Sequence, residues 1–136
     1  MILLRIDGYP CVFYGDLYGC GGDNPQPPVS SLDKFILARK CYAYGDIRDY
    51  WDYPNCVGWV RTGNDKFDGC AVVLCNGSAD GTKWMEVGKE HAGEKWVDLL
   101  GWYQGEITIN GDGWAQFICH SASVSIWINK DGRPAN

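Results

Sequence analysis

Short apolar segments separated by glycine turns fill the chain from residue 44 onward, and this pattern limits the fold more than any other feature. Turn pairs such as Asn76-Gly77 and Asp80-Gly81 separate the segments. Strands at this spacing predict an antiparallel β-sandwich with Greek-key connections, and the lack of a fixed-period repeat argues against a propeller or solenoid. The expected strands are Tyr44–Tyr50, Val57–Arg61, Cys70–Cys75, Thr82–Val87, Lys95–Leu99, Glu106–Ile109, Trp114–Cys119 and Val124–Ile128.

The last of these segments alternates between two faces. Its aliphatic residues share one face, which we expect to lie in the core. They are Val124, Ile126 and Ile128. The opposite face, with Ser123, Ser125 and Trp127, is expected to point outward.

The part before residue 44 has a different pattern. The apolar run Cys11–Tyr14, between Gly-Tyr-Pro and Gly-Asp, predicts a strand buried on both faces. Residues 17–28 are rich in glycine and proline and form a loop. Ser30 or Ser31 is then expected to cap a helix that ends near Cys41 or Tyr42. Strand, loop and helix in this order are typical of a β/α unit.

Composition narrows the classes of partner. The 136 residues carry a net charge of -5 and no basic cluster, which argues against a nucleic acid or an anionic membrane surface. No segment reaches the roughly 20 apolar residues that a membrane span needs. The first four residues are too short for a signal peptide, so the compartment stays open.

Seven cysteines and two histidines give little support for a zinc site, because no C-x-x-C pair is present. The number of cysteines is odd and their spacing is irregular. We therefore expect several buried reduced thiols, and one disulfide between neighbouring strands stays open as an alternative.

Several motifs, taken in order, resemble those of α-amylases. They are Gly8–Asp16, Leu32–Gly45, Asp49–Asp52, Val57–Arg61, Met85–Gly88, Ala92–Asp98, Gly113-Trp114 and Ser123–Trp127. The resemblance implies that residues 1–43 are the last β/α unit of a catalytic (β/α)8 barrel, that 44–130 form the C-terminal β-sandwich domain, and that 131–136 are a tail.

The resemblance also implies what the segment lacks. α-Amylases cleave internal α-1,4 links in starch with a nucleophilic Asp, a general-acid Glu and a second Asp, all on earlier barrel strands. No residue here matches those three, so the chain alone is expected to be inactive. Asp16 corresponds to the rim below the substrate cleft. The pairs Asp49/Asp52 and Asp65/Asp68 are expected to be solvated, and His91 and His120 to lie in surface turns.

Some relatives bind calcium between barrel and β domain. The matching positions are the Pro54 carbonyl and the side chains of Asn55 and Asn76. Asparagine replaces aspartate at both, which removes two negative charges, so calcium binding is expected to be weak or absent. As turn residues, both asparagines have a simpler explanation.

Aromatic residues suggest weak contact with an α-glucan, since sugar rings pack on flat aromatic side chains. The candidates are Trp102 and Tyr103, in a loop with Gln104, and Trp127. Core packing is the alternative for each. Three functions remain: the C-terminal part of an α-amylase, a stand-alone α-glucan-binding module, or an interaction protein that self-associates through residues 11–14.

Overall fold

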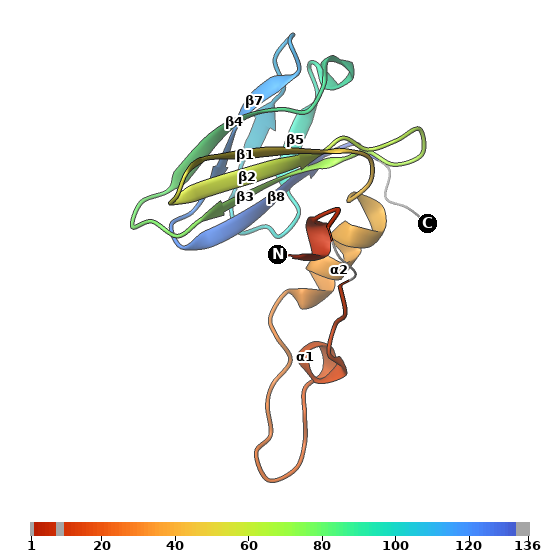
Figure 1. Cartoon of the computed structure of the whole chain (residues 1–136), viewed down its shortest axis with the longest axis vertical. Coiled ribbons are helices and arrows are strands. Elements are labelled where there is room, and N and C mark those ends of the chain that lie inside the picture. The colour runs from red at the N-terminus through yellow and green to blue at the C-terminus, as the bar shows by residue number, and fades with distance from the viewer. Residues whose placement is uncertain (1, 8–9, 133–136) are drawn as a thin grey trace.

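The computed structural model describes residues 2–7 and 10–132. Two short α-helices and a 3-10 turn precede eight strands, with a second 3-10 turn between the fourth and fifth strands (Figure 1). The elements are η1 (Ile2–Leu4), α1 (Tyr14–Tyr18), α2 (Leu32–Cys41), β1 (Ile47–Tyr53), β2 (Cys56–Arg61), β3 (Cys70–Cys75), β4 (Gly81–Glu86), η2 (Lys89–His91), β5 (Lys95–Asp98), β6 (Glu106–Thr108), β7 (Trp114–Cys119) and β8 (Ser123–Asn129).

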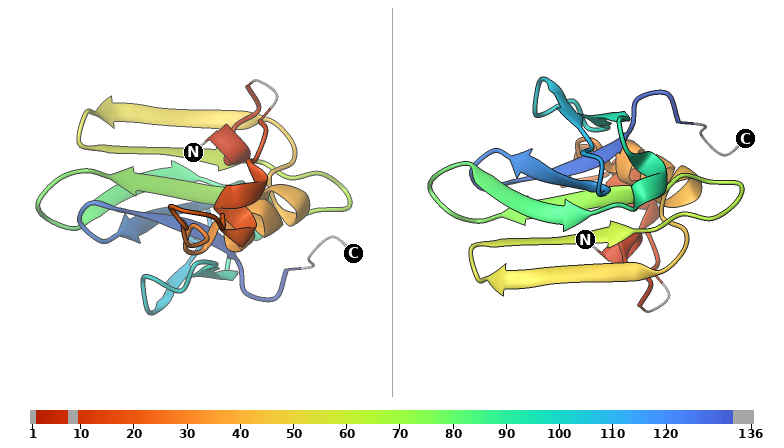
Figure 2. Two further views of the ribbon diagram at one scale, coloured as in Figure 1. Left: turned by 90° about the horizontal axis from the view of Figure 1, so that it is seen from below. Right: turned by 90° about the horizontal axis from the view of Figure 1, so that it is seen from above.

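The strands form two antiparallel sheets. The larger sheet has the order β1-β2-β3-β8-β5-β6, and the smaller one pairs β4 with β7. The chain therefore crosses to the small sheet at β4, returns for the β5–β6 hairpin, crosses again at β7 and returns at β8. Figure 2 shows the larger sheet from its two faces, with the helices in front in the left view and β4 and β7 in front in the right view.

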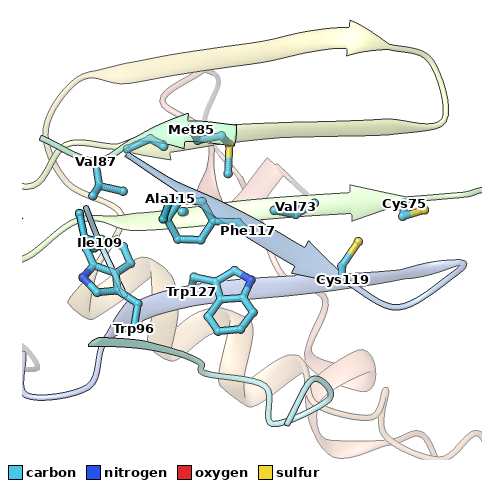
Figure 3. Packing of buried hydrophobic residues seen from close by; sticks show 12 residues of the cluster. Val73, Cys75, Met85, Val87, Trp96, Ile109, Ala115, Phe117, Cys119 and Trp127 are labelled. Carbon is cyan, nitrogen blue, oxygen red and sulfur yellow. The ribbon is translucent and has the colours of Figure 1, made fainter. Parts of the chain in front are cut away.

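The larger sheet is covered on both faces. One face packs on β4 and β7 around Trp96, Phe117 and Trp127, all fully buried (Figure 3). The other face packs on η1 and α2, where Leu4 and Ala38 meet Ile126. The six-stranded sheet is thus the middle layer of three, and its central strands are buried on both sides.

The sequence predicted this part of the fold well. All eight strands form, with β3 and β7 at the predicted bounds, and the sandwich is antiparallel. Helix α2 is also confirmed, and Ser31 occupies its N-cap position as expected, but the side-chain cap does not form. Ser31 has a φ of 65° and makes no side-chain capping bond.

The outward face predicted for the last strand is wrong. Val124, Ile126 and Ile128 are buried toward the helices, as expected. Ser125 and Trp127 are buried too, 1% and 0% exposed, because the small sheet covers their side. An alternating pattern separates two faces but does not tell whether a second layer covers the polar one.

The buried strand predicted at Cys11–Tyr14 is also wrong. Residues 11–13 form no strand, and Tyr14 begins α1. Phe13 and Tyr14 are 65% and 72% exposed. No strand in the described part of the chain lies beside this run, and an apolar sequence without a ladder partner has no reason to stay extended and buried. Gly8 and Tyr9 lie outside the described residues, as do residues 133–136 of the predicted tail.

None of the helices among the described residues has the length and apolar character needed to cross a membrane.

Candidate functional site

One buried carboxylate shapes the loop that carries Trp102. Asp98, at the end of β5, is 7% exposed and accepts four backbone N–H bonds of 3.0–3.1 Å. The donors are Leu100, Trp102, Tyr103 and Ile126. The Gln104 amide closes the turn by donating to the Gly101 carbonyl at 2.8 Å. The aromatic loop is therefore a fixed structure tied to β8.

Trp102 lies beside an open groove. Its side chain is 41% exposed and meets Phe35 of α2 edge-on, with ring centroids 6.3 Å apart. The groove has a volume of about 440 Å³ and includes Asn76 and Ser123 among its lining residues. Trp102 is thus a partly exposed aromatic residue beside a groove that polar side chains also line.

Tyr103 and Trp127 do not continue this surface. The two rings touch each other, with centroids 5.7 Å apart, and Tyr103 also packs on His120 at 5.0 Å. Trp127 is fully buried, and its indole nitrogen donates to the Ile118 carbonyl at 2.9 Å. The expectation of an exposed Trp127 platform is therefore wrong, and Tyr103 is half-buried against Trp127 and His120.

The two asparagines do meet. The backbone N–H of Asn76 donates a hydrogen bond of 3.1 Å to the backbone carbonyl of Asn55. Both residues line a pocket of about 170 Å³ together with Pro54. This pocket shares Leu74, Cys75 and Asn76 with the Trp102 groove. No carboxylate lines this pocket, so the oxygen atoms that it could offer to a metal ion are neutral. Within residues 2–7 and 10–132 there is no group of three His, Cys, Asp or Glu side chains arranged to hold a metal ion.

The other polar candidates take structural roles. His91 is 7% exposed and bonded to Glu94 at 2.6 Å, so its predicted surface position is wrong. His120 is exposed, as predicted, and lies 3.3 Å from Asp80. Asp49 and Asp52 are exposed, as predicted, and pair with Arg5 and Lys83. Asp16 is an exposed residue of α1.

The expected buried thiols are confirmed for Cys70, Cys75 and Cys119. Burial raises the pKa of both Cys70 and Cys119 to about 12. These side chains therefore stay protonated at neutral pH and behave as small apolar groups.

Sequence reasoning gave no role to two exposed tryptophans of the sandwich. Trp84 of β4 is 56% exposed on the outer side of the small sheet, opposite Gln116. Trp51 of β1 is 59% exposed, and the Arg5 guanidinium lies 5.0 Å from its ring. The signal for Trp84 was its shared face with Glu86, since a tryptophan alternating in step with a charged residue points outward.

Comparison with known proteins gives a consistent result. The chain is 45% identical over 132 residues to a glucan 1,4-alpha-maltohexaosidase of Bacillus sp. strain 707, with 96% of this chain covered. It is 44% identical to an alpha-amylase of Geobacillus stearothermophilus and 41% identical to a cytoplasmic alpha-amylase of Escherichia coli. The matches cover 25%, 23% and 28% of those proteins, so the chain spans about a quarter of their length. No family model matches the chain.

Solved structures agree in fold. An alpha-amylase from Anoxybacillus matches with a TM-score of 0.55 at 15% identity, over 79% of this chain and 23% of that one. A variant of AmyP solved with maltotriose matches with a TM-score of 0.50 at 10% identity, over 74% and 20%. At these identities the agreement concerns the fold alone.

Proposed function

Because the chain is homologous to a quarter-length segment of α-amylases, we propose that it is the C-terminal, non-catalytic part of a starch-hydrolysing enzyme. The observation that carries the proposal is 45% identity over 96% of the chain. Retaining hydrolysis of a glycosidic bond requires two carboxyl groups about 5 Å apart that flank the bond. We infer from the resemblance to α-amylases that this pair belongs to a part of the enzyme outside the matched segment.

A starch assay tests this proposal. The isolated chain, checked for a folded circular dichroism spectrum, is expected to release no reducing sugar from soluble starch. Turnover that persists through purification and follows the protein peak would overturn it.

An apolar surface on the first third of the chain supports a role within a larger protein. Phe13, Tyr14, Tyr18 and Val29 are each more than half exposed. Phe13 and Val29 line a groove of about 320 Å³ that Phe35 also lines. Exposed apolar clusters of this kind mark interaction surfaces. We propose that this surface, rather than an isolated strand, packs on the remaining part of a complete enzyme.

Self-association through residues 11–14 is the competing use of this surface. Light scattering of the isolated chain at increasing concentration distinguishes the two. A monomer at all concentrations removes the self-associating protein as an alternative. If dimers form, replacement of Phe13 and Tyr14 by aspartate should abolish them, whereas the matched exposed change Trp84→Ala should not.

Weak α-glucan binding is a second candidate, favoured by the exposed Trp102 ring beside its groove. Isothermal titration with maltoheptaose tests it, with heat expected for the native chain and lost in Trp102→Ala. Trp84→Ala is the matched control. No heat at millimolar sugar, or equal heat in both variants, would remove Trp102 as a sugar contact.

Calcium binding is proposed to be weak or absent in this chain. Asn55 and Asn76 would supply neutral oxygens, and calcium affinity rises with the number of charged ligands. Melting temperatures in millimolar calcium and in chelator are therefore expected to be equal. A rise that depends on calcium concentration would show specific binding to the folded chain.

A further inference from the structure

Three cysteines meet at one end of the space between the two sheets. Cys56 on β2 and Cys75 on β3 come from the large sheet, and Cys119 on β7 comes from the small one. Cys75 and Cys119 lie at the same end of the core (Figure 3). Gly81, which pairs with Cys119, leaves room for the cluster: a Cβ there would lie 2.9 Å from the Cys56 Sγ and 3.1 Å from the Cys75 Sγ.

Cys56 and Cys75 are directly opposite each other in the β2–β3 ladder. The neighbouring pair, Asn55 and Asn76, is hydrogen-bonded through its backbone. Hydrogen-bonded and non-hydrogen-bonded pairs alternate along an antiparallel ladder, so Cys56 and Cys75 form a non-hydrogen-bonded pair. In such pairs the Cα atoms are about 4.5 Å apart, within the range that a disulfide spans.

The two side chains also share a face. Cys75 belongs to the cluster between the sheets, and Cys56 packs against that cluster. They differ in access, because Cys75 is buried whereas Cys56 is partly exposed. The pair therefore combines a partly exposed thiol, which a small reagent can reach, with a buried thiol on the neighbouring strand directly opposite it.

We propose that Cys56 and Cys75 are a disulfide-forming pair that is oxidised by a small disulfide of the glutathione class. The Cys56 thiolate attacks one sulfur of the reagent, the reagent's S–S bond breaks, and a small thiolate leaves. The Cys75 thiolate then attacks the Cys56 sulfur, forms the Cys56–Cys75 bond and releases the second small thiolate. Two protons from the protein thiols end on the two leaving groups, and the reagent takes up two electrons.

The bond would close the β2–β3 hairpin at its open end. Residues 56 and 75 bracket both strands and the connection between them. Restricting a loop of this length in the unfolded chain is expected to raise the melting temperature by about 10 °C. This inference does not depend on the proposed function, since it needs neither starch nor the remaining part of an enzyme.

Peptide mapping of the whole chain tests the proposal. The reduced protein is incubated with oxidised glutathione, the remaining thiols are blocked under denaturing conditions, and the digest is examined by mass spectrometry. We expect a Cys56–Cys75 cross-linked peptide, five blocked thiols out of seven, and reversal by dithiothreitol. Seven blocked thiols, or cross-links confined to other cysteines such as Cys75 with Cys119, would overturn the assignment.

Variants check the thermal effect. Cys56→Ser should lose both the cross-linked peptide and the oxidant-dependent rise in melting temperature. Cys20→Ser removes a thiol from the distant loop before α2 and should retain both. Mapping of the native chain decides the proposal even where a variant fails to fold.

Discussion

The indole nitrogen of Trp59, on β2, donates a hydrogen bond of 3.2 Å to the carbonyl oxygen of Leu4, 55 residues earlier. Leu4 itself is fully buried against the face of the sheet that α2 also covers. Arg39 of α2 donates to the neighbouring Leu3 carbonyl at 2.7 Å. The 3-10 turn η1 is therefore held from both the sheet and the helix, and it forms part of the folded unit.

Leu4→Ala is expected to lower the free energy of unfolding by about 3 kcal/mol, because it leaves a cavity in a closely packed layer. Urea denaturation followed by tryptophan fluorescence measures this loss. Ile6→Ala, at a position that is 53% exposed, is the matched control and should change stability by less than about 0.5 kcal/mol. Equal effects of the two changes would mean that η1 is not packed in solution.

Lys83 and Asp52 are an asymmetric ion pair. The Lys83 side chain is 5% exposed and the Asp52 side chain 70%. Asp52→Asn leaves a buried ammonium without its charged partner, whereas Lys83→Met removes the buried charge itself. We therefore expect Asp52→Asn to lower the melting temperature more than Lys83→Met does. The reverse order would show that the pair contributes through the lysine's packing.

The same pair gives a pH dependence. The hydrogen bond from Lys83 lowers the pKa of Asp52 from its ordinary value of 3.8. A carboxyl with a lowered folded-state pKa stabilises the fold above its unfolded pKa, and this stabilisation disappears as the pH falls through the folded value. The melting-temperature difference between the native chain and Asp52→Asn should thus narrow below about pH 4.

How much of this structure the sequence predicts depends on what surrounds each segment. Cys70–Cys75 was located to the residue, because a run of apolar residues between two polar turns fits a central strand that is buried on both faces. Trp127 was assigned to the wrong environment since Ser123 and Ser125 made its face look polar. The layer that covers that face is formed by β4 and β7, which the local pattern does not describe.

In the candidate site too, the local sequence predicts some residues correctly, whereas the roles of others depend on distant parts of the chain. Trp102 was identified from its loop composition, and it is the one predicted sugar contact whose ring is exposed among the described residues. Asn55 and Asn76 were paired only through the resemblance to α-amylases, because nothing in the sequence between them fixes the register of β2 against β3. Asp98 was missed altogether. Its role depends on four amide donors, one of them 28 residues further along the chain.

Cys70 predicts the behaviour of the fold at alkaline pH. Burial raises the pKa of its thiol from 9.0 to about 12. The folded state therefore keeps this proton more tightly than the unfolded state, and stability is retained below about pH 9 and lost as the pH rises toward 12. The loss attributable to this thiol is on the order of 4 kcal/mol, at 1.36 kcal/mol per pKa unit. Urea denaturation at pH 8 and pH 10.5 should show a steeper loss for the native chain than for Cys70→Ala.

Asp98 offers the sharpest test of how the aromatic loop is held. Asp98→Ala removes the acceptor of four buried N–H bonds and should lower the free energy of unfolding by about 3 kcal/mol or more. Asp98→Asn keeps one side-chain oxygen as an acceptor. Its NH2 group replaces the other oxygen and cannot accept the hydrogen bonds that this oxygen received from backbone N–H groups. If the amide faces the loop, Trp102 and Tyr103 lose their acceptor while Leu100 and Ile126 keep theirs. Asp98→Asn should then lower the free energy of unfolding less than Asp98→Ala does, and amide hydrogen exchange should accelerate at Trp102 and Tyr103 but not at Ile126.

Uniform acceleration of exchange at all four amides would mean that the carboxylate holds the strand end as a whole and does not separately fix the loop.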